Sequence, residues 1–300
     1  MSNDTNGMQT GQKSGTLYVV STPIGNLEDI TLRALRILKG VDLIAAEGVK
    51  HFRVLCRHYG IPGRVVRYNQ HNHRVRGPEL IRRLKSGSDV ALVTNAGTPC
   101  VSDPGVPLVR EALQEDIAVS PIPGPSAVTA ALSASGLRSD AFVFLGFLSN
   151  RASRRRKELK ALASDPRTMV FYEAPHRLAG MLKDLLEILG DRRSVLVREM
   201  TKVYEEVIPG TVSALLEKVE KEHPKGEMVL AVEGKEGAQE DSGLDHRVRR
   251  RIRNLLQDHT LSVRDIAARL AQEEGISFRN AYKTCLYVQR GSHHEDHEEE

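Results

Sequence analysis

The chain has 300 residues, of which 40% are hydrophobic and 27% charged, which is typical of a folded globular protein and excludes general disorder. At roughly 150 residues per domain, this length predicts about two domains. The formal net charge is only +4, but the last ten residues contain five acids and no Lys or Arg, which leaves +9 on residues 1–290. The body of the protein is therefore more basic than its total charge indicates.

No run of residues reaches the ~18 apolar positions of a membrane span, and the polar leader at residues 1–14, which we expect to be disordered, lacks the apolar stretch of a signal peptide. The three cysteines (Cys56, Cys100 and Cys285) are odd in number and scattered. Neither a disulfide framework nor a zinc site is expected, and the sequence contains no metal-binding constellation. We expect a cytoplasmic protein without membrane or metal partners.

Short apolar runs alternate with amphipathic segments over residues 15–137, which predicts an α/β domain with a mostly parallel sheet. The predicted strands are residues 16–20, 41–46, 89–94 and 117–122. The predicted helices are residues 28–39, 50–58, 75–86, 104–114 and 125–135.

A composition shift near Leu137 predicts a boundary, with a second α/β domain over residues 138–234. Two of its predicted strands, 195–199 and 203–208, have no helix between them, which favours a mixed sheet. The other strands are expected at AFVFLGF, RTMVFYEA and GEMVLAVEG. Helices are expected from Ser153, over 176–189 and over 211–221.

A polar linker is expected at residues 235–244, followed by a basic segment of about three short helices at 245–290. Part of this segment is typical of a helix-turn-helix, with Ser262 and Ser277 as helix caps, a shape used on nucleic acid but also for plain packing. The acidic tail at 291–300 is left out of the fold prediction.

The loop at residues 95–105 is the strongest local feature, because it follows a predicted parallel strand, where open α/β sheets bind their ligands. Gly97 permits close backbone approach, and Thr98, Ser102 and Asp103 supply polar groups. The plain alternative is that Asp103 only caps a helix beginning at Pro104.

Two further loops follow predicted strands and point to the same edge of the sheet. After the first strand, Pro23 and Gly25 form a tight turn, which could equally be an ordinary capped loop. In IPGPSAV, the residues Pro123 and Gly124 stiffen a turn, and Ser126 with Ala127 opens a helix whose N–H groups can meet a ligand. Together with residues 95–105 these loops predict a cleft. A dinucleotide Rossmann site and a P-loop are disfavoured, because GxGxxG and GxxxxGK[ST] are both missing.

Charged residues recur at strand ends in the second half. In YEAPHR, Glu173 and Arg177 flank a Pro turn, where a packing role is the plain alternative. The charges of REMTKVYEE could be cross-strand ion pairs without chemistry. The charged residues at the start of KGEMVLAVEG could lie on a solvent-exposed edge of the sheet.

Basic residues concentrate in two runs, six Lys or Arg at residues 151–160 and five at 247–253. Such runs are usually solvated helix faces, but two of them in a modestly charged chain favour a polyanionic partner bound in a salt-sensitive way.

Six segments, in this order along the chain, carry a specific resemblance to a known family: LYVVSTPIGNLEDITLRALRILKGVDLIAAE, NAGTPCVSDPGVPLV, PIPGPSAVTAALSASGL, FYEAPHRL, REMTKVYEEV and KGEMVLAVEG. Over residues 15–290 the chain resembles the bacterial ribosomal RNA small-subunit methyltransferase I family, itself similar to the tetrapyrrole methylases and diphthine synthase. The resemblance implies a two-domain, non-Rossmann α/β methylase that binds S-adenosylmethionine (SAM) between its domains as a homodimer. It also implies methylation of the ribose 2′-hydroxyl of a decoding-region cytidine in 16S rRNA, within the assembled small subunit.

The resemblance and the loop positions together give three sets of candidate residues. The catalytic candidates are Glu47, Asp103 and Glu173. The cofactor-binding candidates are Pro23, Gly25, Asn95, Gly97, Thr98, Ser102, Asp103, Pro123, Gly124, Ser126, Ala127, Met200, Glu227 and Met228. The RNA-binding candidates are Lys50, Arg154, Arg155, Arg156, Arg177, Lys202, Arg249, Arg250 and Arg251.

Two positions depart from the pattern of the family that the chain resembles. Where that family reads Glu-Asp-Thr-Arg, this chain has Glu47-Gly48-Val49-Lys50, and Lys lacks the planar fork of Arg. Asn95 stands in place of an Asp, and an amide cannot act as a base. Two alternatives therefore stay open beside rRNA methylation: a methylase of a tetrapyrrole or protein residue, and an RNA-binding protein with impaired catalysis.

Overall fold

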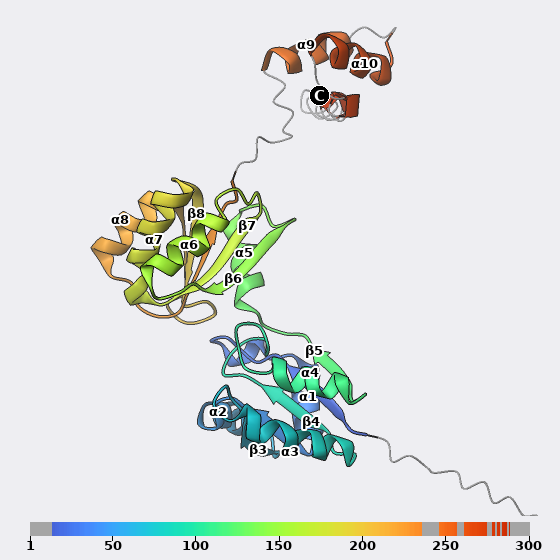
Figure 1. Ribbon diagram of the computed structural model, residues 1–300, viewed down its shortest axis with the longest axis vertical. Helices are drawn as coiled ribbons and strands as arrows, with labels where there is room; N and C mark the ends of the chain where they lie inside the picture. Colours follow the sequence, from blue (N-terminus) through green and yellow to red (C-terminus); the bar gives the residue numbers. More distant parts are fainter. Residues whose placement is uncertain are drawn as a thin grey trace, which may run out of the picture. The chain divides into compact units, whose positions relative to one another are not determined.

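The computed structural model describes residues 14–235, 246–256, 261–274 and 278–288, the last without 280, 283 and 287. The chain divides into two compact units, one with both β-sheets and one with the C-terminal helices (Figure 1). Apart from Ser14 and Lys235, the predicted leader, linker and acidic tail lie outside the described residues. Because one unit holds both sheets, a domain boundary within it stays a prediction.

The first sheet has five parallel strands in the order β3-β2-β4-β1-β5, which confirms the predicted parallel sheet. Its strands are β1 Thr16–Val20, β2 Leu43–Ala46, β3 Arg64–Arg67, β4 Val90–Val93 and β5 Ala118–Ile122. The sequence prediction missed β3, because this edge strand has only two apolar residues between two arginines. Since all five strands are parallel, their carboxyl ends share one edge.

Helices cover both faces of the first sheet. Their bounds are η1 Leu27–Asp29, α1 Leu32–Gly40, α2 Val49–Tyr59, α3 His73–Lys85 and α4 Val106–Gln114. Apolar residues of α1 and α2 share a core with one face, and those of α3 and α4 share a core with the other. Thr31 begins α1 by accepting a hydrogen bond from the Ala34 N–H (3.1 Å).

The second sheet is mixed, as predicted, in the order β6-β7-β10-β8-β9 with only β6 and β7 parallel. Its strands are β6 Phe142–Phe147, β7 Thr168–Glu173, β8 Arg193–Arg198, β9 Glu206–Thr211 and β10 Met228–Val232. Strand β9 begins three residues later than the predicted 203–208, because the backbone turns there: Lys202 N–H donates to Glu199 O and Glu205 N–H to Lys202 O.

One face of the second sheet packs against α6 Ala152–Ala161, α7 Pro175–Leu189 and α8 Val212–Glu222. The other face packs against α5 Ala127–Ser135, through Val128, Ala131 and Leu132 (Figure 1). The sequence prediction grouped this helix with the first domain. Its packing places it in the second core, a relation that local composition does not encode.

The C-terminal unit contains α9 His246–Leu256, α10 Val263–Glu274 and helical residues within 278–288. They share a small core that includes Ile252, Ile266, Leu270 and Cys285. Ser262 caps α10 as predicted, accepting a hydrogen bond from the Asp265 N–H (3.2 Å), whereas Ser277 lies outside the described residues. In the described part of the chain, no helix is both long and apolar enough to cross a membrane.

Candidate active site

A cavity of about 350 Å³ lies where loops from both sheets meet, a volume within the range of small-molecule sites. Its walls come from the loops after β1, β4 and β8, from the ends of β6 and β7 with the residues that follow β7, and from the starts of α5 and β10. The lining residues are Ile24, Ala96, Gly97, Thr98, Val101, Asp103, Ser126, Ala127, Phe147, Tyr172, Glu173, Ala174, Pro175, Met200, Gly226, Glu227, Met228 and Val229.

The loop after β4 is held in a strained conformation. Gly97 has φ 73° and exchanges two backbone hydrogen bonds with Thr22 (2.9 and 3.0 Å). Cys100 (φ 71°) and Ser102 (φ 62°) also occupy the left-handed region, which costs a non-glycine residue about 1–2 kcal/mol. Thr98 anchors the loop by donating from Oγ1 to Pro125 O (3.2 Å). Strain of this kind clusters at ligand sites, where the surrounding structure maintains it.

Asp103 lines the cavity and is not a helix cap. Helix α4 begins at Val106 with Gly105 as its N-cap residue, so the alternative that Asp103 caps a helix at Pro104 is wrong. Burial raises the pKa of Asp103 to about 6, and the negative charge of Glu47 adds to the shift. Glu47 itself accepts a hydrogen bond at Oε2 from the Asn95 N–H (3.2 Å). The two carboxylates therefore lie close enough to repel each other.

Gly48 and Asn95, the two departures noted in the sequence, meet in the structure. A Cβ built on Gly48 would lie 2.2 Å from Asn95 Oδ1, so the carboxamide occupies space that any larger residue at position 48 would need. The two departures are physically coupled.

This coupling predicts that Gly48→Ala lowers the free energy of unfolding by about 1 kcal/mol, from the displaced carboxamide and a poorer N-cap. In a double-mutant cycle with Asn95→Ala, the two effects should differ from additivity by about 0.5–1.5 kcal/mol. Denaturant unfolding measures both quantities. Gly40→Ala is the control, because a Cβ there meets nothing within 4 Å. Additivity within about 0.3 kcal/mol would contradict the coupling.

Glu173 ends β7 and is 2% exposed at the wall of the cavity. Its Oε1 accepts from the Ala174 N–H (2.8 Å) and pairs with Arg177 Nε (3.1 Å). Its Oε2 is buried and has no hydrogen-bond donor within the described part of the chain. Burying an acceptor oxygen without a hydrogen bond costs free energy of folding unless a ligand supplies the donor.

An aromatic pair forms another wall. Phe147 and Tyr172 meet edge to face with ring centroids 5.6 Å apart, and Phe147 is 58% exposed. Burial raises the pKa of Tyr172 to about 12, with a smaller contribution from Asp103, so the phenol stays protonated at neutral pH. Apolar and aromatic walls of this kind suit a flat heterocycle.

Two glycines allow the loops to approach closely. A Cβ on Gly25 would lie 2.6 Å from Lys202 Cγ, and the neighbouring Asn26 N–H donates to Thr201 Oγ1 (3.0 Å). Gly226 has φ 98° and faces Glu199, whose Oε1 accepts from the Glu227 N–H (2.8 Å). The turn after β1 is therefore fixed against the loop after β8.

Eight of the predicted cofactor-binding residues line the cavity: Gly97, Thr98, Asp103, Ser126, Ala127, Met200, Glu227 and Met228. The other six do not line it: Pro23, Gly25, Asn95, Ser102, Pro123 and Gly124. The sequence prediction missed Phe147 and Tyr172, although each lies at or next to the end of a predicted strand, which is the signal that could have found them.

The charge of the cavity is one-sided. Asp103, Glu173 and Glu227 line it, and the described lining includes no Lys, Arg or His. Glu173 and Glu227 are paired with cations outside the lining, Arg177 (3.1 Å) and Lys202 (3.0 Å), so the acceptor left open is Glu173 Oε2, which favours a ligand with a hydrogen-bond donor. Among the residues that the structure describes, no cluster of three metal-ligating side chains occurs.

Structure corrects the RNA-binding prediction for Arg155. Its side chain is 9% exposed and donates from Nε to Asp184 Oδ2 (2.7 Å), so it holds α6 to α7 and is not available to a phosphate. Arg156 also pairs with Asp184 (2.7 Å) and with Glu187, and Arg154 pairs with Glu158 (3.2 Å).

The other RNA-binding candidates differ in exposure. Arg177 pairs with Glu173 and donates to Leu148 O (2.6 Å), which gives it a structural role. Lys202 bridges Glu199 and Glu227, whereas Lys50 is exposed. Arg251 pairs with Glu273, and the side chains of Arg249 and Arg250 lie outside what the structure describes.

Comparison with known proteins gives a consistent result. The family model for "Tetrapyrrole (Corrin/Porphyrin) Methylases" matches residues 16–216. A "Ribosomal RNA small subunit methyltransferase I" of Escherichia coli O157:H7 is 44% identical over 279 residues, covering 92% of this chain and 96% of that protein. A protein of the same name from Thermotoga maritima is 46% identical over 222 residues, covering 74% of this chain and 100% of that protein.

Solved structures share the fold at lower identity. A diphthine synthase superposes with a TM-score of 0.60 at 21% identity, covering 74% of this chain and 90% of that one. A cobalt precorrin-4 methyltransferase gives a TM-score of 0.57 at 17% identity, covering 73% and 94%. These neighbours confirm the predicted non-Rossmann α/β methylase fold.

Proposed function

We propose that this chain, which belongs to the ribosomal RNA small-subunit methyltransferase I family, methylates the ribose 2′-hydroxyl of a cytidine in the decoding region of 16S rRNA. Methylation of small-subunit rRNA with SAM as the methyl donor is the activity of this family. The nucleoside, the 2′-oxygen and the decoding region are the parts that we propose. The observation that carries the reaction is the cavity in which the partly buried Asp103 lies together with the unpartnered Oε2 of Glu173.

The residues of the cavity fit SAM, which when bound supplies a methyl group activated on a positively charged sulfur. Glu173 Oε2, buried and without a donor, is placed to accept a hydrogen bond from SAM. Phe147 and Tyr172 offer an aromatic wall for an adenine ring. Ser126, the N-cap of α5, makes no side-chain capping bond, so the N–H groups of Val128 and Thr129 that such a cap would engage are open to a carboxylate.

Asp103 is the group that we assign to the hydroxyl proton. A ribose hydroxyl is a poor nucleophile until its proton has an acceptor, and a base works best with a pKa near the working pH. Asp103 lines the cavity, is only partly buried, and has a pKa raised to about 6. Glu47 and Glu173 each hold a backbone N–H, so we assign them positioning roles.

The wider context is also a proposal. We expect a cytoplasmic homodimer that acts on the assembled small subunit, as the family resemblance implies. The sequence also allows methylation of a tetrapyrrole or protein residue, or RNA binding with impaired catalysis. The transfer experiment separates these readings.

The test incubates purified protein and labelled SAM with small subunits that lack the modification. After digestion of the 16S rRNA, label should appear in 2′-O-methylcytidine from one decoding-region position. Label on a base, or no label in rRNA, would overturn the proposal. Calorimetric binding of SAM without any transfer would instead identify an RNA-binding protein with impaired catalysis.

A further inference from the structure

We propose that the exposed basic side of α2 and the edge strand β3 binds the phosphate backbone of the rRNA substrate and leads it to the cavity. This surface, named the α2–β3 basic face, consists of Lys50, Arg53, Arg57 and Arg67. Its assignment to rRNA rests on the proposed function, but its ability to bind RNA is measured independently of methyl transfer.

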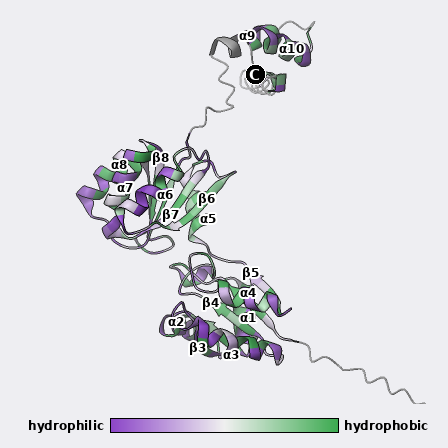
Figure 2. Ribbon diagram, in the orientation of Figure 1, coloured by the Kyte–Doolittle hydropathy of each residue, from purple (hydrophilic) through white to green (hydrophobic). Residues whose placement is uncertain are grey.

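The charge in this part of the chain is strongly one-sided. Residues 31–87 contain thirteen Lys and Arg against three Asp and Glu, which is the densest separation of charge outside the two basic runs of the sequence. Helix α2 contains no acid, and Figure 2 colours much of α2 and α3 as hydrophilic. A surface of this kind attracts a polyanion and gains affinity by counterion release.

The spacing of residues in α2 places its cations on one side. Phe52 and Leu55 are buried against the first sheet, so the opposite side of the helix faces solvent. Lys50, Arg53 and Arg57, all exposed, follow at intervals of three and four residues and form one stripe. From the first to the third, the stripe runs about 10 Å along the helix axis.

Strand β3 extends this stripe along the edge of the sheet. Val65 packs against the core that contains α2, and side chains alternate along a strand, so Arg67 lies on the α2 side. Arg67 pairs in register with Ala46, directly before Glu47. Because α2 begins two residues after Glu47, the basic face reaches the carboxylates beside the cavity.

These cations have no acidic partner among the residues that the structure describes. None of the four forms an ion pair within the described part of the chain, and all four are exposed. Lys50, in the first turn of α2, opposes the helix dipole, which costs about 0.3–1 kcal/mol at the surface, whereas Arg57 in the last turn favours it. Helix stability therefore does not account for the placement of Lys50.

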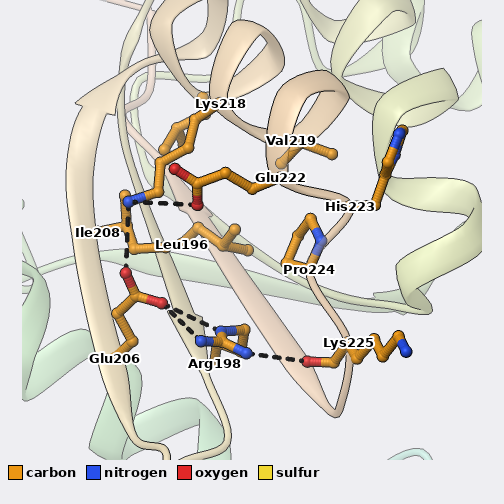
Figure 3. A pocket seen from close by; sticks show the side chains of 11 residues that line it. Leu196, Arg198, Glu206, Ile208, Lys218, Val219, Glu222, His223, Pro224 and Lys225 are labelled. Atoms are coloured by element: carbon orange, nitrogen blue, oxygen red, sulfur yellow. Dashed lines mark hydrogen bonds and ion pairs between the residues drawn. The ribbon is translucent and has the colours of Figure 1, made fainter.

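A second cavity shows the contrasting arrangement (Figure 3). There Arg198 pairs with Glu206 (2.8 Å), and Lys218 pairs with Glu206 (3.3 Å) and Glu222 (3.7 Å). In α6, part of a run that the sequence marked for RNA, Arg154, Arg155 and Arg156 are likewise paired. The four cations of the α2–β3 basic face form no such pair among the described residues.

The test compares Arg53→Gln/Arg57→Gln/Arg67→Gln with the parent protein in binding to deproteinised 16S rRNA and to small subunits. Affinity at about 150 mM salt should fall by about 10- to 100-fold, and the slope of log K against log salt should decrease by about 2. The control is Arg138→Gln/Lys183→Gln/Lys218→Gln, which removes the same charge from acid-paired positions of the second half.

Several outcomes overturn the proposal. Unchanged rRNA affinity and salt slope in the first triple variant would do so, as would an equal loss in the control variant. If the first triple variant kept its rRNA affinity but lost binding to vesicles of phosphatidylcholine with phosphatidylglycerol, the face would be assigned to a membrane surface. Calorimetric SAM binding and the unfolding midpoint check that the variant is folded. If the parent protein bound rRNA normally without ribose methylation, the proposed function would be rejected, but the RNA-binding role of this face would not.

Discussion

Replacement of Asp103 by Asn is expected to lower kcat for methyl transfer by about 10²- to 10⁴-fold, the usual contribution of a general base. The amide has nearly the shape of the carboxylate but cannot accept the hydroxyl proton. SAM affinity, measured by calorimetry, should change little, because Glu173 and the aromatic wall remain. Asp140→Asn, in an exposed pair with Arg138, is the matched control.

The pH dependence gives a second measurement of the same assignment. Asp103 acts when ionised, and its pKa is raised to about 6, so kcat/KM should rise with pH through about 6 and then level. Glu47→Gln removes a like charge, which should lower the pKa of Asp103 and move the rise to lower pH. A profile that is flat near pH 6, or a kcat within tenfold of the parent in Asp103→Asn, would show that the proton leaves without this carboxylate.

Replacement of Asp184 by Ala is expected to lower the free energy of unfolding by about 3–5 kcal/mol, because it leaves the Arg155 guanidinium buried without its partner. The two side chains are 9% and 5% exposed, and the pair ties α6 to α7. Denaturant unfolding measures this loss. The acidic partner, not the length of the basic run, decides whether Arg155 can be tolerated in the core.

Two further variants separate this buried pair from ordinary surface charge. Glu187→Ala removes a side chain that is 59% exposed and should change stability by no more than about 1 kcal/mol. Arg155→Met/Asp184→Leu, which removes both buried charges, should recover much of the loss. A cost below about 1 kcal/mol for Asp184→Ala would contradict the buried ion pair.

Local patterns in the sequence were sufficient for most of the fold. Four parallel strands and the mixed second sheet follow from short apolar runs, and the loop at 95–105 stands out because its glycines and prolines follow a strand. Strand β3 was missed because Arg64 and Arg67 enclose only two apolar residues, which is too short for a periodicity signal. Packing beside β2 makes this segment a strand.

The candidate site was predicted in outline and completed by tertiary contacts. Residues of 95–105 and 126–127 were found from their position after strands, since parallel strands must end at one edge. Phe147 and Tyr172 were missed, because their role depends on the second sheet meeting these loops at one cavity. The coupling of Gly48 to Asn95 likewise joins residues that are distant in the chain.

The sequence by itself determined the family, the parallel sheet and the excess of positive charge. Only the tertiary structure decided which of those charges are free. The run at 151–160 is basic in the sequence, but folding brings Asp184 and Glu187 of α7 against it. Helix α2 has no such partner in the described residues, so its weaker local run remains exposed. Charge is a property of composition, whereas its neutralisation depends on which helices pack together, and that is settled in three dimensions.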